Sequence, residues 1–134
     1  MKIDRPFFDT NILLYLLSED NNKADRAEAI IAKGGIISVQ VLNEFSSVAS
    51  RELKMTYAEI RDTLQIVRAV CKTEPITIDT HELGLEIAER FGFSLYNSMI
   101  VSSALQSGCN LLYSEDMQHC QEINAQLVII NPFQ

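Results

Sequence analysis

Cysteine is scarce in this sequence, and its spacing argues against two common ways of holding a small fold together. Cys71, Cys109 and Cys120 are odd in number and far apart, and no C-x-x-C pair is present. This argues against both a disulfide framework and a structural zinc site. His119 next to Cys120 has no second pair at metal-ligand spacing. We therefore expect the fold to rest on a hydrophobic core.

Long hydrophobic runs are also missing. No stretch approaches the roughly 18 consecutive apolar residues of a membrane span. Near the start of the chain, Asp4, Asp9 and Asn11 break up the apolar stretch, which is unlike a signal peptide. The chain has 134 residues, 47% of them hydrophobic, and it contains no internal repeat. We expect one compact domain over residues 1–134 in a soluble, cytoplasmic protein.

Positive charge is in short supply, because the formal net charge is −7 at pH 7. A protein that binds nucleic acid mainly through contacts to its phosphates is expected to be basic. An acidic chain therefore has no polyanionic partner, holds a cation that changes the local sign of the charge, or binds a basic protein.

Short apolar runs alternate with segments of helical periodicity along the chain. The runs expected to form strands are 6–8, 36–39, 76–78, 110–114 and 127–130. Helices are expected between them, and one begins at the capping box formed by Thr56 and Glu59. The strands are uninterrupted apolar runs, as in a parallel sheet that is covered on both faces. The pattern predicts an α/β sandwich with a mostly parallel sheet of about five strands.

Four polar side chains are expected near the places where strands end. Asp9 directly follows the first strand, and Asp116 lies shortly after the fourth. Glu44 lies at the edge of the apolar face of the helix after the second strand, and Asn97 heads the apolar face of a later helix. Ligands of open parallel sheets bind beyond the carboxyl ends of the strands. We therefore expect these four side chains to converge at that edge.

Each of these residues also has a simpler interpretation. Asp9 is a plausible cap of the first helix, and Asp116 is a plausible cap of a helical turn. Glu44 at a helix edge is ordinarily a solvated acid. Ser94 and Asn97 resemble a weakened capping box. Taken singly, none of the four indicates a functional site, so the hypothesis depends on their occurring together.

A group of acids at one sheet edge predicts a bound cation. Carboxylates that meet there repel one another and raise the pKa of at least one of them unless a cation intervenes. Oxygen ligands without nearby Cys or His are typical of a hard divalent ion such as Mg²⁺ or Mn²⁺. Such an ion lowers the pKa of a bound water and neutralises phosphoryl oxygens. It would reconcile an acidic protein with a polyanionic substrate.

The order of the motifs resembles a known family. FFDTNILLYLL, SVQVLNEF, FSLYNSMIVSSAL and LLYSEDM are similar to the four signatures of the PIN domain, and more narrowly to the VapC-type toxins of bacterial toxin–antitoxin pairs. The resemblance implies a three-layer α/β/α sandwich and a Mg²⁺- or Mn²⁺-dependent endoribonuclease that cleaves RNA, often transfer RNA. It also implies a homodimer and a cognate antitoxin that blocks the acidic pocket.

The resemblance also assigns roles to particular residues. It places the catalytic, metal-binding positions at Asp9, Glu44, Asn97 and Asp116. Asn11 and Ser114 match supporting polar positions. Asn97 departs from the family pattern, which has an aspartate there, and an amide coordinates metal only through its carbonyl oxygen. The lost negative charge is expected to weaken metal binding and catalysis. Both a deliberate inactivating substitution and a natural variant with altered catalysis would explain it.

Three other interpretations stay open at this point. The chief one is a non-catalytic PIN-like module that binds RNA or a protein, for which Asn97 is the best support. A signalling receiver domain would use Asp79 as its phosphorylated acid, but no lysine follows a late strand. A phosphatase with an aspartate nucleophile would use Asp9, but the second aspartate of its D-x-D motif is replaced by Asn11.

Overall fold

The computed structural model describes residues 4–134, and strands and helices alternate along it. The strands are β1 (Pro6–Phe8), β2 (Gly35–Ser38), β3 (Cys71–Glu74), β4 (Leu111–Tyr113), β5 (Glu122–Ile123) and β6 (Leu127–Ile130). The helices are α1 (Thr10–Leu14), α2 (Asn21–Ala32), α3 (Val39–Arg51), α4 (Tyr57–Val70), α5 (Ile78–Phe91) and α6 (Leu95–Gln106), with a short 3-10 turn η1 (Tyr15–Leu17).

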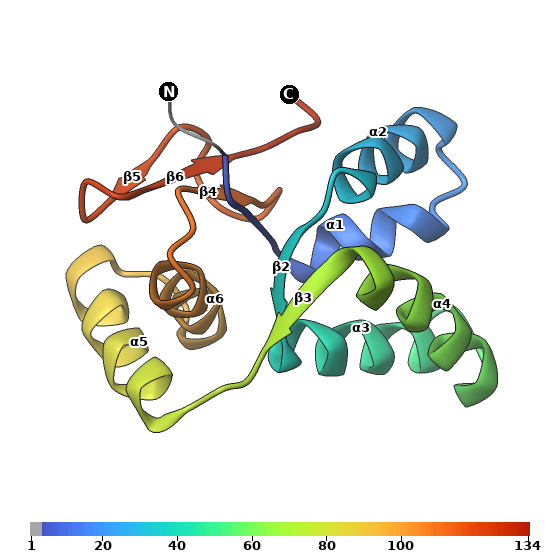
Figure 1. Ribbon diagram of the computed structural model, residues 1–134, viewed down its shortest axis with the longest axis horizontal. Coiled ribbons are helices and arrows are strands. Elements are labelled where there is room, and N and C mark those ends of the chain that lie inside the picture. Colours follow the sequence, from blue (N-terminus) through green and yellow to red (C-terminus); the bar gives the residue numbers. More distant parts are fainter. Residues whose placement is uncertain (1–3) are drawn as a thin grey trace.

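The six strands form one sheet in the order β3-β2-β1-β4-β6-β5. All neighbouring strands are parallel except β5 and β6, which are antiparallel. Helices α1–α4 lie to one side of the sheet, and α5 and α6 pack against each other on the other side (Figure 1). The predicted α/β/α sandwich with a mostly parallel sheet is therefore confirmed.

The prediction of a strand at 76–78 was wrong. The strand is β3 (Cys71–Glu74), which ends directly before Pro75. Thr77 instead caps α5, where its side chain accepts a hydrogen bond from the backbone N–H of Thr80. Ile78 is 74% exposed as the first residue of that helix. The β-branched residues resembled a strand, but a local cap and a proline without an N–H decided the structure.

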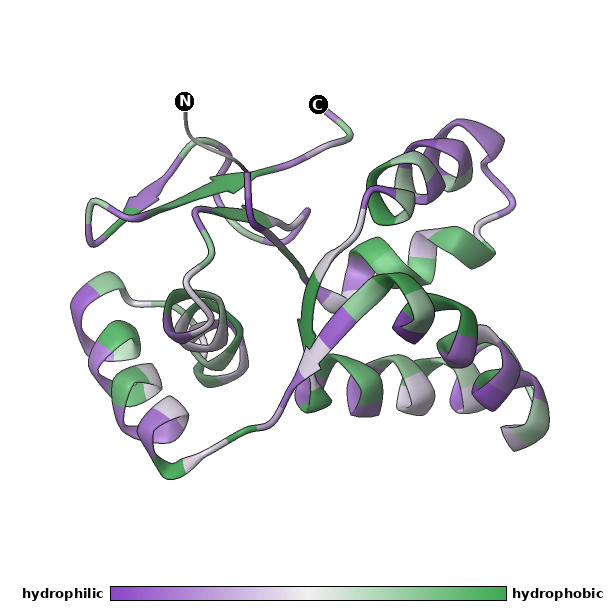
Figure 2. Cartoon of the chain, viewed as in Figure 1, coloured by the Kyte–Doolittle hydropathy of each residue, from purple (hydrophilic) through white to green (hydrophobic). Residues whose placement is uncertain are grey.

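The sheet has six strands, whereas about five were predicted, because both edge strands depart from the apolar pattern. β3 carries Lys72 and Glu74, which form a salt bridge, and it contains hydrophilic segments in Figure 2. β5 has only two residues. Edge strands are often short or charged, which hinders pairing with other chains. A search for continuous apolar runs therefore misses them.

The core lies between the sheet and the two helical layers. Phe7, Phe8, Ile37, Leu112 and Ile129 are fully buried on the central strands. β6 is hydrophobic along its length in Figure 2. Burial of this apolar area fixes the register of neighbouring strands, and hence the positions of the residues that follow them. Within residues 4–134, no helix combines the length and apolarity needed to cross a bilayer.

Gly35 allows β2 to approach β1 closely, and we expect Gly35→Ala to destabilise the fold by about 2 kcal/mol. A Cβ on this residue would lie 2.6 Å from Cε2 of Phe8 and 2.8 Å from the carbonyl oxygen of Pro6. The added methyl group would therefore separate the strand that precedes Asp9 from its neighbour. Urea unfolding of both proteins measures the effect, and equal midpoints and slopes would contradict the expectation.

Candidate functional site at the carboxyl ends of the strands

Asp9 lies between the end of β1 and the start of α1, and the structure gives it two roles. One carboxylate oxygen accepts a hydrogen bond from the backbone N–H of Thr10 at 2.7 Å, which caps the helix. The other accepts a hydrogen bond from the Ser114 hydroxyl at 2.8 Å. Asp9 is only 5% exposed. The predicted cap is confirmed, and the same carboxylate connects β1 to the loop after β4.

Burial raises the pKa of Asp9 from 3.8 to about 6. The hydrogen bonds from Ser114 and Thr10 oppose this shift, because they stabilise the ionised form. The negative charges of Asp116 and Glu44 raise the pKa further. The charges of Asp116 and Glu44 therefore each act on Asp9, as expected for acids near one edge of a sheet.

Glu44 lies on α3 and is half-buried. Its Oε1 atom accepts a hydrogen bond from the Thr10 hydroxyl at 3.3 Å and another from Nε2 of Gln40 at 3.0 Å. Thr10 thus joins two of the acids, with its N–H bound to Asp9 and its hydroxyl bound to Glu44. This arrangement does not match the simpler interpretation of Glu44 as a fully solvated acid.

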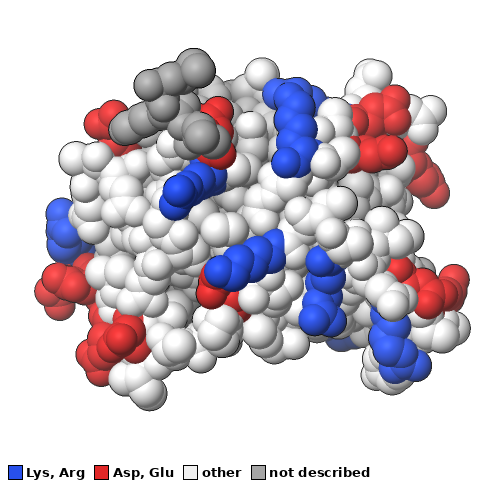
Figure 3. Space-filling model, in the orientation of Figure 1, with Lys and Arg blue, Asp and Glu red and all other residues white. Residues whose placement is uncertain are grey.

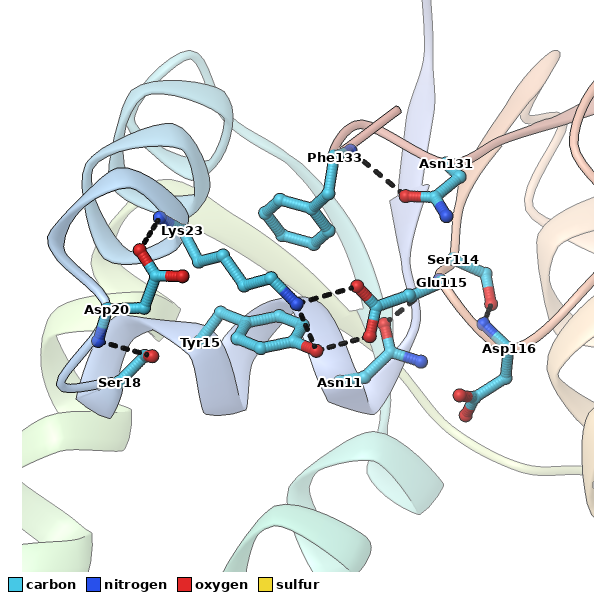
Figure 4. Close-up of polar contacts among 10 residues, drawn as sticks. All are labelled: Asn11, Tyr15, Ser18, Asp20, Lys23, Ser114, Glu115, Asp116, Asn131 and Phe133. Carbon is cyan, nitrogen blue, oxygen red and sulfur yellow. Dashed lines mark hydrogen bonds and ion pairs between the residues drawn. The ribbon is translucent and has the colours of Figure 1, made fainter.

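Asp116 follows β4 in a loop whose backbone is tied to the same network. Its N–H donates a hydrogen bond to Oγ of Ser114 at 3.2 Å, so Ser114 lies between Asp9 and Asp116. Its own side chain is exposed, unlike that of Asp9. Figure 4 shows the carboxylate of Asp116 directed away from that of its neighbour Glu115. Asp116 therefore presents its charge to solvent at the edge of the site.

Asn97 lies in the first turn of α6, where Ser94 is the N-cap and accepts a hydrogen bond from the Asn97 N–H at 3.2 Å. The start of this helix is joined to α3, because Nε2 of Gln40 donates to the carbonyl oxygen of Tyr96 at 3.2 Å. The same nitrogen donates to Glu44. Asn97 is half-buried, and its side-chain amide forms no hydrogen bond with other residues in the range 4–134. Ser94 therefore caps the helix, as expected, and the Asn97 side chain takes no part in the cap.

The donor chemistry around Asp9 fits a hard divalent ion. Asp9, Glu44 and Asp116 carry carboxylate oxygens, and Asn97, in the first turn of α6, carries a neutral amide oxygen. The repulsion that contributes to the raised pKa of Asp9 would be relieved by a cation. Within residues 4–134, no three His, Cys, Asp or Glu side chains are close enough to form a ready-made metal site.

Sequence reasoning missed several residues that organise this site. Thr10 bridges two acids, and Gln40 bridges Glu44 and the start of α6. The spacing of Gln40 and Glu44, four residues apart on one helix, was a usable signal. Asn11 was predicted to support the site, and its Oδ1 atom accepts a hydrogen bond from the N–H of Glu115 at 3.3 Å. Its Nδ2 atom is buried without a partner in the described part of the chain.

A pocket of about 500 Å³ lies elsewhere, at the amino ends of β1, β2 and β4. Arg5, Arg26 and Lys33 line it together with a single acid, Asp4. Figure 3 shows that Lys and Arg side chains cross the middle of one face, while most acids lie toward its left and right margins. The overall negative charge of the chain therefore conceals an uneven distribution.

Comparisons with known proteins agree with this architecture. The PIN domain family model matches residues 7–122. No curated protein sequence matches the chain. A toxin–antitoxin complex from Klebsiella pneumoniae has a similar fold, with a TM-score of 0.71, 20% identity and coverage of 95% of this chain and 97% of that chain.

Two further solved structures are similar. The first is VapC20 from Mycobacterium tuberculosis, described as a Sarcin-Ricin loop cleaving toxin, with a TM-score of 0.67, 19% identity and coverage of 83% of this chain and 89% of that one. The second is VapBC2 from Rickettsia felis, bound to a DNA fragment from its promoter, with a TM-score of 0.67, 18% identity and coverage of 92% and 96%. Because the family model spans the chain from β1 to β5, this protein belongs to the PIN domain family.

Proposed function

We propose that this PIN domain is a metal-dependent endoribonuclease that hydrolyses phosphodiester bonds of RNA, with transfer RNA as the expected substrate. The observation that carries the proposal is the buried Asp9 carboxylate at the end of β1, held by Ser114 and repelled by Asp116 and Glu44. Family membership and the similarity of the fold to VapC toxins support the same activity.

The proposed mechanism assigns a task to each residue around Asp9. Asp9, Glu44 and Asp116, with the carbonyl oxygen of Asn97, would hold Mg²⁺ or Mn²⁺. When bound, such an ion lowers the pKa of a coordinated water and neutralises charge on the phosphoryl group. Thr10 fixes one oxygen of Asp9 and also orients Glu44. The exposed carboxylate of Asp116 faces the solvent from which RNA must approach.

Asn97 is expected to impair this activity. Asp9, Glu44 and Asp116 bring three negative charges, whereas an aspartate at position 97 would bring a fourth. Binding of a divalent cation weakens when an anionic ligand becomes neutral, and the water nucleophile is then less well placed. We therefore propose that the chain binds metal weakly and cleaves RNA slowly.

The expected partners follow from the similar structures, which include toxin–antitoxin proteins from Klebsiella pneumoniae and Rickettsia felis. We propose that this chain is the toxin of such a pair in the cytoplasm, that it forms a homodimer, and that a cognate antitoxin inhibits it. A basic segment of the antitoxin would find complementary charge at Asp9, Glu44 and Asp116, and the net charge of −7 is compatible with this.

A second candidate function is a non-catalytic module that binds RNA or a protein. Two observations favour it. Asn97 occupies a proposed ligand position, and the basic pocket lined by Arg5, Arg26 and Lys33 lies at the opposite ends of the strands from the acids. In that case phosphate contacts would come from the cations, and the acids would have no role in chemistry.

Titration with Mn²⁺ by calorimetry, followed by digestion of total transfer RNA, tests the proposal. We expect Asp9→Asn to weaken Mn²⁺ binding by about tenfold or more, because it removes the central negative charge of the site. Asp79→Asn is the matched control, since Asp79 is an exposed acid on α5. Equal Mn²⁺ binding by the parent chain and Asp9→Asn would reject the metal site and favour the binding module.

A further inference from the structure

Glu115 is directed away from the acidic site although it lies between Ser114 and Asp116. Its side chain extends toward α1 and α2 (Figure 4). One carboxylate oxygen accepts a hydrogen bond from the Tyr15 hydroxyl, and the other forms a salt bridge with Nζ of Lys23 at 3.2 Å. Lys23 also donates to the Tyr15 hydroxyl at 3.2 Å. The three groups form a closed triangle of polar contacts.

The last aromatic residue of the chain completes this cluster. The rings of Tyr15 and Phe133 meet edge to face, with centroids 4.7 Å apart. The Lys23 ammonium lies 4.6 Å from the centre of the Tyr15 ring and 5.6 Å from that of Phe133. These contacts add cation–π attraction to the ion pair. The pKa of Lys23 is raised, first by its hydrogen bond to Tyr15 and then by its hydrogen bond to Glu115. We call Tyr15, Lys23, Glu115 and Phe133 the clamp.

The backbone of the same loop residue is anchored as well. The N–H of Glu115 donates to Asn11 on α1, so both the main chain and the side chain of Glu115 are held by the first helical segment. On either side of it, Ser114 binds Asp9, and the N–H of Asp116 donates to Ser114. A displacement of Glu115 would therefore move both neighbours relative to Asp9.

We propose that the clamp positions the loop 114–116, and with it Asp116 and the Ser114 hydroxyl, against Asp9. Tyr15, Lys23 and Phe133 are thus positioning residues, although none of them contacts the acids of the site directly. The expected effect of the clamp on metal binding and catalysis rests on the proposed function. Its role in holding the loop does not. The clamp joins four separate parts of the fold, namely η1, α2, the loop after β4 and the segment after β6.

The test measures amide hydrogen exchange by NMR in Lys23→Met and Tyr15→Phe. We expect exchange at Glu115 and Asp116 to become about tenfold faster, because each change removes a hydrogen bond to a charged group. Lys23→Arg should retain the slow exchange of the parent chain, since the guanidinium keeps the ion pair with Glu115. Lys72→Met is the matched control, because it breaks the salt bridge to Glu74 within the edge strand β3 and should leave the loop unchanged.

The outcomes separate a positioning role from a general loss of stability. Faster exchange that is confined to the loop, with weaker Mn²⁺ binding in the same variants, supports the proposal. Faster exchange spread evenly over the chain, or unchanged rates at Glu115 and Asp116, overturns it. If the parent chain binds no Mn²⁺, the proposed function fails, while the exchange rates and the rescue by Lys23→Arg still decide whether the clamp holds the loop.

Discussion

Asn97→Asp is expected to increase the rate of transfer RNA cleavage in the presence of Mn²⁺ by about a hundredfold, a typical effect of one well-placed group at such a site. The substitution adds a carboxylate at the start of α6, which Gln40 joins to Glu44 on α3. The added charge should strengthen binding of the divalent ion and place its water more accurately. Fragment formation on denaturing gels, with Mn²⁺ and with EDTA, measures the effect.

Two controls limit the interpretation of that experiment. Asn97→Ala should cleave as slowly as the parent chain. Asp9→Asn combined with Asn97→Asp should abolish the increase in cleavage rate. Cleavage by the parent chain as fast as by Asn97→Asp would mean that Asp9, Glu44 and Asp116 suffice for the reaction. If the double variant cleaved as fast as Asn97→Asp alone, Asp9 would have no part in the reaction. No cleavage by any form, together with absent Mn²⁺ binding, would favour the binding module.

Asp9→Asn is expected to stabilise the metal-free protein by up to about 3 kcal/mol at pH 7.5, even though it should abolish activity. The folded protein raises the pKa of Asp9 from 3.8 to about 6, chiefly by burial. Between these values the folded state binds more protons than the unfolded state, so stability falls as the pH rises through that range. A shift of this size lowers the free energy of unfolding by about 3 kcal/mol at neutral pH, where Asp9 is ionised. The neutral amide of Asp9→Asn does not have this cost.

Urea unfolding of the parent and Asp9→Asn at several pH values measures this prediction. The difference in unfolding free energy should be largest above pH 6 and should shrink toward zero near pH 4, where Asp9 is protonated in the folded state. The amide loses the charge-assisted hydrogen bond from Ser114, which offsets part of the gain. A variant less stable than the parent at pH 7.5 would show that the two hydrogen bonds outweigh burial. Saturating Mn²⁺ should reverse the order by stabilising only the parent.

The fold was largely predictable because its signals are local. The apolar run 6–8 became β1, and the capping box of Thr56 and Glu59 starts α4 with both of its hydrogen bonds present. The failure at β3 has an equally physical cause. Edge strands need not be apolar, and β3 carries charged residues. Of the strand-like residues after Pro75, Thr77 caps α5 and Ile78 begins it.

The candidate site was predictable only in part. The positions of Asp9 and Asp116 after parallel strands indicated a common edge, and the charge of Asp116 does reach Asp9. The contacts of Thr10 with Glu44 and of Gln40 with Tyr96 join different helices, and no local spacing in the sequence indicates them. The metal-binding role of Asp9, Glu44, Asn97 and Asp116 stays a prediction that the experiments above decide.

The sequence by itself determined where helices such as α1 and α4 begin, which stripes are apolar and which residue types stand after the strands, because caps and periodicity act within a few residues. Only the tertiary structure decided that Glu115 turns away from its acidic neighbours to meet Lys23, 92 positions earlier in the chain. Burial of the central strands fixes their register, and this register brings the segments after β1 and β4 together. Contacts between such distant segments depend on the packing of the whole core, and for that reason they cannot be read from local patterns.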